Sequence, residues 1–227
     1  MATPFLTSPL EAAWLHLGAT MKQSDGGWRL PASFAGAASE MNVAKQAVGI
    51  GDESARGKLL LQGDKIGHAL RQTYGAAPGH VGEVVRTHSV ETALLRPDRA
   101  HVGTTEASHM ESFAALTSSC EGTPLTITDV THGRFEIRVV GPEAPSLLSK
   151  VCGLDFDSGE FPTDTAQLTS VAKTRQLILR LDMGDLPAYR LIGGRTLGGY
   201  VWETLMEAGR EFGAEPIGAN TLKTLAG

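Results

Sequence analysis

Two charged residues in this sequence stand where a predicted strand meets a turn, a position from which a side chain can act on a ligand. Arg180 closes the apolar run Leu177–Leu179, and its planar guanidinium suits a bidentate contact to a carboxylate. The alternative is an ion pair with Asp182 or Asp185 within the chain. Glu91 begins an earlier apolar strand; a partly buried carboxyl there would have a raised pKa and handle protons, whereas a solvated one would not.

The other residues that could carry chemistry predict no metal site and no phosphate loop. The sequence has seven histidines, and their spacing lacks the close clustering of metal ligands. Gly49-Ile50-Gly51 lacks the third glycine of a dinucleotide fingerprint and precedes a predicted strand. Cys120 and Cys152 share no CxxC spacing, so we expect neither a disulfide framework nor a zinc site.

The segments around these residues repeat one pattern of secondary structure. Residues 57–75 predict a short strand, a glycine turn and an amphipathic helix. Residues 133–153 predict the same order, because Phe135, Ile137 and Val139 alternate along a strand and a helical stripe follows. The pattern predicts two halves of similar construction.

A second pair of matching segments follows the first. Residues 90–118 predict a strand, a turn, a second strand and a helix, and residues 176–212 predict the same order. We therefore expect one α+β domain over residues 1–227, built as a pseudo-symmetric tandem repeat with halves at about 50–122 and 123–213. The units of this repeat are a strand with a helix and a hairpin with a helix. A seam between such halves is a favoured place for a ligand.

The composition is that of a globular protein and argues against several kinds of partner. The chain has 227 residues, 41% hydrophobic and 20% charged, and a net charge of -5. A negative net charge without a basic run argues against binding to nucleic acid or to an anionic membrane. The sequence has neither a signal peptide nor an apolar stretch of about 18 residues, so we expect no membrane span and a cytoplasmic location.

Sequence motifs along nearly the whole chain point to one family. The motifs are Gly18–Met21, Gly27–Phe34, Glu40–Ser54, Gly57–Leu59, Asp129–Thr131, Val139–Ala144, Val201–Gly209 and Pro216–Lys223. In this order they resemble the aminomethyltransferases, the T-protein of the glycine cleavage system and its folate-binding relatives. The resemblance implies a folate-binding domain that holds tetrahydrofolate in a central cavity, which agrees with the predicted seam.

The sequence departs from the family's pattern at positions that carry function there. The family's catalytic aspartate stands before the strand that leads into Leu95–Asp98, and here the nearest carboxylate is Glu91. The family's folate-contacting asparagine aligns with Thr105, which keeps hydrogen-bonding ability but loses the paired donor and acceptor of the amide. A tyrosine and a glutamate of the family align with Met183 and Leu186.

The resemblance also bears on domain organisation. T-proteins carry a C-terminal β-barrel after this domain, and the present sequence ends at Gly227, where that region would begin. We therefore expect the folate-binding domain without the barrel. Compact relatives of this kind include the small subunit of heterotetrameric sarcosine oxidase, which the segment Pro187–Trp202 resembles at least as well.

The resemblance implies a protein that binds tetrahydrofolate and transfers a one-carbon unit to it from a small amine or aminomethyl carrier. In this hypothesis Glu91 orients or accepts a proton and Arg180 holds a carboxylate, while Thr105 and Tyr189 contact the pterin or its tail. The expected protein partner is a lipoyl carrier or an oxidase subunit. The alternatives are a non-catalytic scaffold subunit of a folate-linked, sarcosine-type amine oxidase, and a folate-binding regulator without chemistry.

Overall fold

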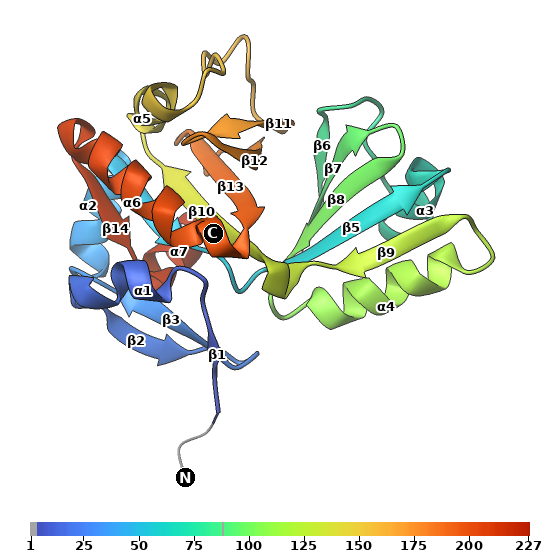
Figure 1. Cartoon of the computed structure of the whole chain (residues 1–227), viewed down its shortest axis with the longest axis horizontal. Helices are drawn as coiled ribbons and strands as arrows, with labels where there is room; N and C mark the ends of the chain where they lie inside the picture. The colour runs from blue at the N-terminus through green and yellow to red at the C-terminus, as the bar shows by residue number, and fades with distance from the viewer. Residues whose placement is uncertain (1–3, 88) are drawn as a thin grey trace.

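Three β-sheets form the framework of residues 4–87 and 89–227, the part of the chain that the computed structural model describes (Figure 1). The six-stranded sheet has the order β11 (Thr165–Val171), β12 (Thr174–Arg180), β13 (Ala188–Gly194), β10 (Arg134–Val140), β4 (Val48–Asp52) and β14 (Ala214–Ile217). The five-stranded sheet has the order β6 (Val84–Arg86), β7 (Val90–Arg96), β8 (Arg99–Thr104), β5 (Gly57–Gly63) and β9 (Leu125–Asp129). The small N-terminal sheet has the order β1 (Leu6–Thr7), β3 (Trp28–Ser33) and β2 (Thr20–Gln23).

Helices cover the outer faces of the two large sheets. The five-stranded sheet packs against α3 (Ile66–Tyr74) and α4 (His109–Cys120). The six-stranded sheet packs against α1 (Glu11–Trp14), α5 (Ala144–Val151) and α6 (Gly198–Gly209). The remaining helices are α2 (Ala37–Gln46) and α7 (Ala219–Ala226), which lie against β14 and β3 respectively, and the short 3-10 turns η1 (Leu15–Leu17), η2 (Thr131–Gly133), η3 (Arg195–Leu197) and η4 (Arg210–Phe212). Within the described residues, no helix is long and apolar enough to cross a membrane.

Alternation along the strands separates the helix-covered cores from the inner faces of the sheets. In β5, Leu59 and Leu61 pack with the apolar residues of α3 and α4, whereas Lys58 and Leu60 point to the other side. This follows from strand geometry, because successive side chains point to opposite faces. The six-stranded sheet behaves in the same way, and the residues that alternate with its helix-covered core are Arg134, Glu136, Arg138, Arg190 and Ile192.

The inner faces of the two large sheets meet along a seam. Val84 and Ala93 of the five-stranded sheet pack in one buried apolar cluster with Leu177, Leu179 and Ile192 of the six-stranded sheet. Backbone hydrogen bonds also join the two sheets at their edges. The N–H of Val84 donates to the carbonyl of Asp164 at 2.8 Å, and the N–H of Ala166 donates to the carbonyl of Gly82 at 2.7 Å. Figure 1 shows the two sheets as separate lobes that approach each other where β11 and β12 lie near β6 and β7.

The α+β class and the predicted order of elements are confirmed. Strand, helix and hairpin follow one another in residues 57–75, 90–118, 133–153 and 176–212 as the sequence indicates. Gly49-Ile50-Gly51 lies inside β4 and precedes β5, so it does not form the turn of a dinucleotide fingerprint. A Cβ atom at Gly49 would lie 2.7 Å from the Ile217 side chain, so the close approach of β14 explains that glycine.

Candidate functional site

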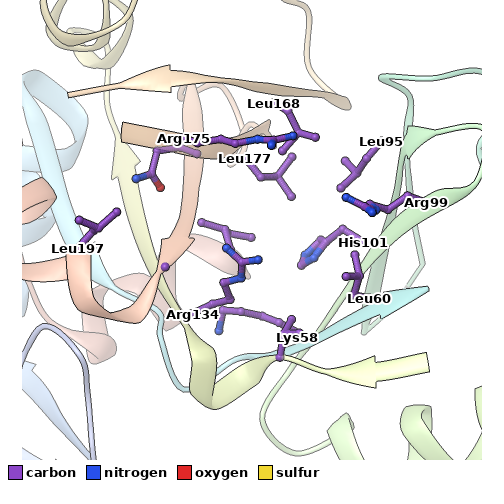
Figure 2. A pocket seen from close by; sticks show the side chains of 14 residues that line it. Lys58, Leu60, Leu95, Arg99, His101, Arg134, Leu168, Arg175, Leu177 and Leu197 are labelled. Carbon is purple, nitrogen blue, oxygen red and sulfur yellow. The ribbon is translucent and has the colours of Figure 1, made fainter. Parts of the chain in front are cut away.

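A cavity of about 370 Å³ lies in the seam between the two large sheets (Figure 2). Its apolar wall is formed by Leu60, Leu95, Leu168, Leu177, Ile192 and Leu197. Its basic groups are Lys58, Arg99, His101, Arg134 and Arg175. Both sheets contribute side chains of both kinds, so the two sheets build one site. The volume lies within the range of small-molecule sites.

Three arginines make the cavity electropositive. Arg134 and Arg175 are exposed on the side of the six-stranded sheet, and Arg99 is half-buried on β8. Within residues 4–87 and 89–227, none of the three forms an ion pair. No carboxylate of the described part of the chain lines the cavity either. Uncompensated positive charge in a concave, partly apolar site favours an anionic ligand.

His101 lies in the wall of the cavity as a buried and neutral imidazole. The residue is 4% exposed, and among the described residues its Nε2 atom has no hydrogen-bond partner. Burial lowers the pKa of His101 to about 4, so the ring carries no charge at neutral pH. The neighbouring Arg99 also has a buried Nε atom that finds no partner in this part of the structure. Polar atoms left unpaired in this way cost about 1–3 kcal/mol each unless a ligand or water satisfies them.

Glu91 lies at the start of β7, inside a buried ion cluster beside the cavity. Its carboxylate accepts hydrogen bonds from Nη2 of Arg56 at 2.9 and 2.8 Å and pairs with Nη1 of Arg190. Burial alone would raise the pKa of Glu91, but the charges of Arg190 and Arg56 outweigh it and lower the pKa to about 2. The raised pKa and the solvated position considered for Glu91 are therefore both wrong, and the group is ionised at neutral pH.

The ion cluster continues through two further carboxylates of the seam. Glu136 is 1% exposed and pairs with Nζ of Lys58 at 3.2 Å and with Nε of Arg190 at 3.3 Å. Glu53 pairs with Nη2 of Arg138 at 2.9 Å and with Nε of Arg190 at 3.0 Å. Burial would raise the pKa of Glu53, and the two arginines lower it to about 2. Arg190 thus contacts carboxylates from β7, from β10 and from the turn after β4, and holds the seam together.

Arg180 and Tyr189 lie together, but away from the lining of the cavity. Nε and Nη2 of Arg180 each donate to Asp182 at 3.1 Å, and Nη1 donates to the carbonyl of Phe161 at 2.7 Å. The internal ion pair with Asp182, the stated alternative for Arg180, is confirmed. Tyr189 is fully buried in the core of the six-stranded sheet, 5.8 Å below the Arg180 guanidinium, and burial raises the pKa of Tyr189 to about 12.

Thr105 follows β8 and makes a local contact at the start of α4. Its Oγ1 lies 2.7 Å from Oγ of Ser108 and accepts a hydrogen bond from the Ser108 N–H at 3.1 Å. Thr105 is not part of the cavity lining. Of the four residues predicted for the site, the structure places only Glu91 in the seam, and it supports the cavity wall without lining the cavity.

Sequence reasoning missed the basic residues that do line the cavity. Arg99 and His101 alternate with the buried Ala100 and Val102, and Arg134 stands beside the buried Phe135. Alternation of charged and apolar residues is the signal that was available. It does not separate an inner wall from an ordinary solvated face, because both show the same period of two.

Neither cysteine lines the cavity, and the described residues offer no group of metal ligands there. Among the described residues, no three or more His, Cys, Asp or Glu side chains form a group that could hold a metal ion. His88 lies outside the described residues. Cys120 and Cys152 are both buried free thiols.

The free energy of unfolding should fall in two steps as the pH is lowered. Between about pH 6.5 and 4, the unfolded chain takes up a proton that the buried His101 does not, which costs about 3 kcal/mol. Between about pH 4.5 and 2, the unfolded chain takes up protons before Glu53 and Glu91 do, because both pKa values are lowered to about 2. In each step the unfolded state binds more protons, so stability decreases. Urea denaturation at a series of pH values measures both steps.

The variant His101→Gln is the control for the first step. In this variant the free energy of unfolding should change little between about pH 6.5 and 4, and the decrease between about pH 4.5 and 2 should remain. The charged groups that face His101 are Glu91, Glu136, Lys58 and Arg190, and all four remain in the variant. A wild-type stability that stays constant from neutral pH down to about pH 4.5 would contradict the first step.

Comparison with known proteins shows one family. The model of the GCVT N-terminal domain matches residues 10–226. The aminomethyltransferase of Saccharopolyspora erythraea is 25% identical over 244 residues, which cover 99% of this chain and 64% of that protein. The aminomethyltransferase of Frankia alni is 29% identical over 238 residues, which cover 96% of this chain and 62% of that protein. The chain thus spans less than two thirds of the length of these curated relatives.

Solved structures show the same fold. The aminomethyltransferase T of the glycine cleavage system from Bartonella henselae superposes with a TM-score of 0.82 at 16% identity, over 98% of this chain and 62% of that one. A chain of the heterotetrameric sarcosine oxidase from Corynebacterium sp. U-96 superposes with a TM-score of 0.68 at 24% identity, over 79% of this chain and 93% of that one. Both likenesses concern the fold alone. The family that the sequence motifs predicted is confirmed.

Proposed function

Because this chain belongs to the aminomethyltransferase family, whose GCVT N-terminal domain it contains, we propose that it binds tetrahydrofolate in the cavity between its two large sheets. Aminomethyltransferases in general depend on folate. The observation that carries the proposal is the cavity itself, which combines apolar walls with three arginines that have no acidic partner among the described residues.

The chemistry of tetrahydrofolate fits the two kinds of wall. Its pyrimidine and aminobenzoyl rings are flat with apolar faces, and Leu60, Leu95 and Leu177 offer apolar contact. Its glutamate tail carries carboxylates, which suit the guanidinium groups of Arg134 and Arg175. Both arginines are exposed, so the charged tail would stay near water, where a carboxylate loses the least hydration.

The proposed activity is transfer of a one-carbon unit from a small amine or aminomethyl carrier to the bound folate. The contribution of the chain is to hold and orient the folate, whose own nitrogen attacks the carbon of the one-carbon unit. The bond from that carbon to the carrier breaks in the same substitution, and the carrier leaves with the bonding electrons and takes up the proton that the folate nitrogen loses. Glu91 supports this by fixing Arg56 and Arg190, since a carboxylate with a pKa of about 2 is a weak proton acceptor at neutral pH. Direct roles for Thr105, Arg180 and Tyr189 stay predictions, because these residues lie outside the cavity lining.

Calorimetric titration with tetrahydrofolate under reducing, anaerobic conditions tests the proposal. We expect saturable binding with a micromolar Kd. The fragment p-aminobenzoylglutamate, which has the tail but no pterin, should bind more weakly and serves as the comparison ligand. If tetrahydrofolate does not saturate the protein at millimolar concentration, the cavity is not a folate site.

A second candidate function is that of a non-catalytic subunit in a folate-linked amine oxidase complex. Two observations favour it: the likeness to a chain of heterotetrameric sarcosine oxidase and the ionised, ion-paired state of Glu91. Affinity purification from native extract separates the two functions. Recovery of a flavoprotein oxidase at fixed stoichiometry would support the subunit, and a purified chain that transfers one-carbon units alone would support the transferase.

We also propose that the two halves are tandem repeats within one domain of residues 1–227. The order β5, α3, β7, β8, α4 is matched by β10, α5, β12, β13, α6. In addition, β9 pairs antiparallel with β5, and β4 pairs antiparallel with β10. The five-stranded sheet therefore includes β9, which comes just before β10 in the chain, and the six-stranded sheet includes β4, which comes just before β5. The cytoplasmic location and a lipoyl-carrier partner remain predictions from the sequence.

A further inference from the structure

Arg99 and His101 form a pair of polar groups on one wall of the cavity. They stand two residues apart on β8, so their side chains leave the same face of the sheet. Figure 2 shows both side chains extending from β8 into the cavity, with Leu95 above them and Leu60 below. On the strand next to β8, Leu60 stands directly opposite His101. The pair thus lies between two leucines of this wall, and Lys58 of β5 is the other basic residue of the same sheet that lines the cavity.

The two groups differ in the hydrogen bonds that they can form with a ligand. Arg99 offers N–H groups and can only donate hydrogen bonds. The neutral imidazole of His101 carries one nitrogen that accepts a hydrogen bond. Among the described residues, Nε of Arg99 and Nε2 of His101 are both buried without a partner, although the protein ties up the neighbouring charges of the seam in ion pairs. A donor next to an acceptor matches a ligand edge in which an acceptor lies next to a donor.

We propose that Arg99 and His101 hold the lactam edge of a heterocyclic ligand, with its carbonyl on Arg99 and its ring N–H on His101. The inference rests on the proposed folate site, and it specifies which end of the ligand lies where. The pterin, which has such an edge, lies against β8. The tail then runs toward Arg134 and Arg175 on the six-stranded sheet.

Three variants test this assignment by calorimetry with tetrahydrofolate. His101→Phe keeps an aromatic ring but removes the acceptor, so the Kd should rise about 10–100-fold. His101→Gln keeps an acceptor, so we expect a rise of less than about 10-fold. His68→Gln on the exposed surface of α3 is the matched control and should leave the Kd unchanged. Binding of p-aminobenzoylglutamate should be the same in all variants, because that fragment lacks the lactam edge.

A spectroscopic measurement on the wild-type protein gives a second readout. In protein labelled with ¹⁵N-histidine, tetrahydrofolate should shift the ring nitrogen signals of His101 and leave those of His68 in place. Equal affinity of wild type and His101→Phe, with unshifted His101 signals, would overturn the assignment and leave the folate site standing. A wild-type protein that does not bind tetrahydrofolate would overturn both.

Discussion

Replacement of Arg190 by alanine should lower the free energy of unfolding by about 3–5 kcal/mol. The side chain is 10% exposed and contacts Glu53, Glu91 and Glu136, which come from three different segments of the chain. Without Arg190, these three buried carboxylates keep fewer positive partners and cannot regain their hydration. Urea denaturation at neutral pH, followed by circular dichroism, measures the loss.

The control for Arg190→Ala is Arg210→Ala. Arg210 is exposed and pairs with Glu207 one helical turn away, so its removal should change stability by less than about 0.5 kcal/mol. Lys keeps the positive charge of Arg190 but not its planar guanidinium. The loss of unfolding free energy for Arg190→Lys should therefore lie between the losses for Arg190→Ala and Arg210→Ala. A loss below about 1 kcal/mol for Arg190→Ala would show that the cluster does not hold the seam.

The double variant Arg134→Ala, Arg175→Ala should weaken tetrahydrofolate binding about 100-fold, because each charged hydrogen bond contributes about 1.5–3 kcal/mol and exposure to water reduces that value. Both guanidinium groups face the cavity, and neither has an ion-pair partner in the described part of the chain. The folding free energy should stay within about 0.5 kcal/mol of the wild type, since no ion pair is lost. Calorimetry measures the affinity, and a higher salt concentration should reduce the difference between the proteins.

Arg71→Ala is the matched control for this loss of charge. Arg71 is an exposed residue of α3 and does not line the cavity, so its removal should leave the Kd unchanged. A double variant that binds within about threefold of the wild type would mean that the carboxylate tail does not reach Arg134 or Arg175.

Position along a strand explains why the predicted site and the observed site differ. Arg180 follows Leu179 by one residue, and successive side chains of a strand point to opposite faces. Leu179 packs in the seam, so Arg180 points to the helix-covered face, where Asp182 and Phe161 bind it. The same parity places Tyr189 in the core and its neighbour Arg190 in the seam.

The elements, their order and the family could all be predicted from the amino-acid sequence. Alternation along β10, the apolar runs of β5 and β12, glycines at the helix ends and the ordered motifs were all readable, because each depends on residues close together in the chain. They also determined which side chains share a face of a strand.

Which face of each strand forms the site depends on long-range packing, which the sequence pattern does not show. The ion pair between Glu91 and Arg190 joins residues 99 positions apart, and the pair between Glu53 and Arg190 joins residues 137 positions apart. Such contacts follow from the packing of one sheet on the other, which no local pattern encodes. The same packing turned Arg99 and His101 from residues that resemble a solvated strand face into the wall of a cavity. It also lowered the pKa of Glu91, since the charges of Arg190 and Arg56 outweigh burial, which by itself would raise that pKa.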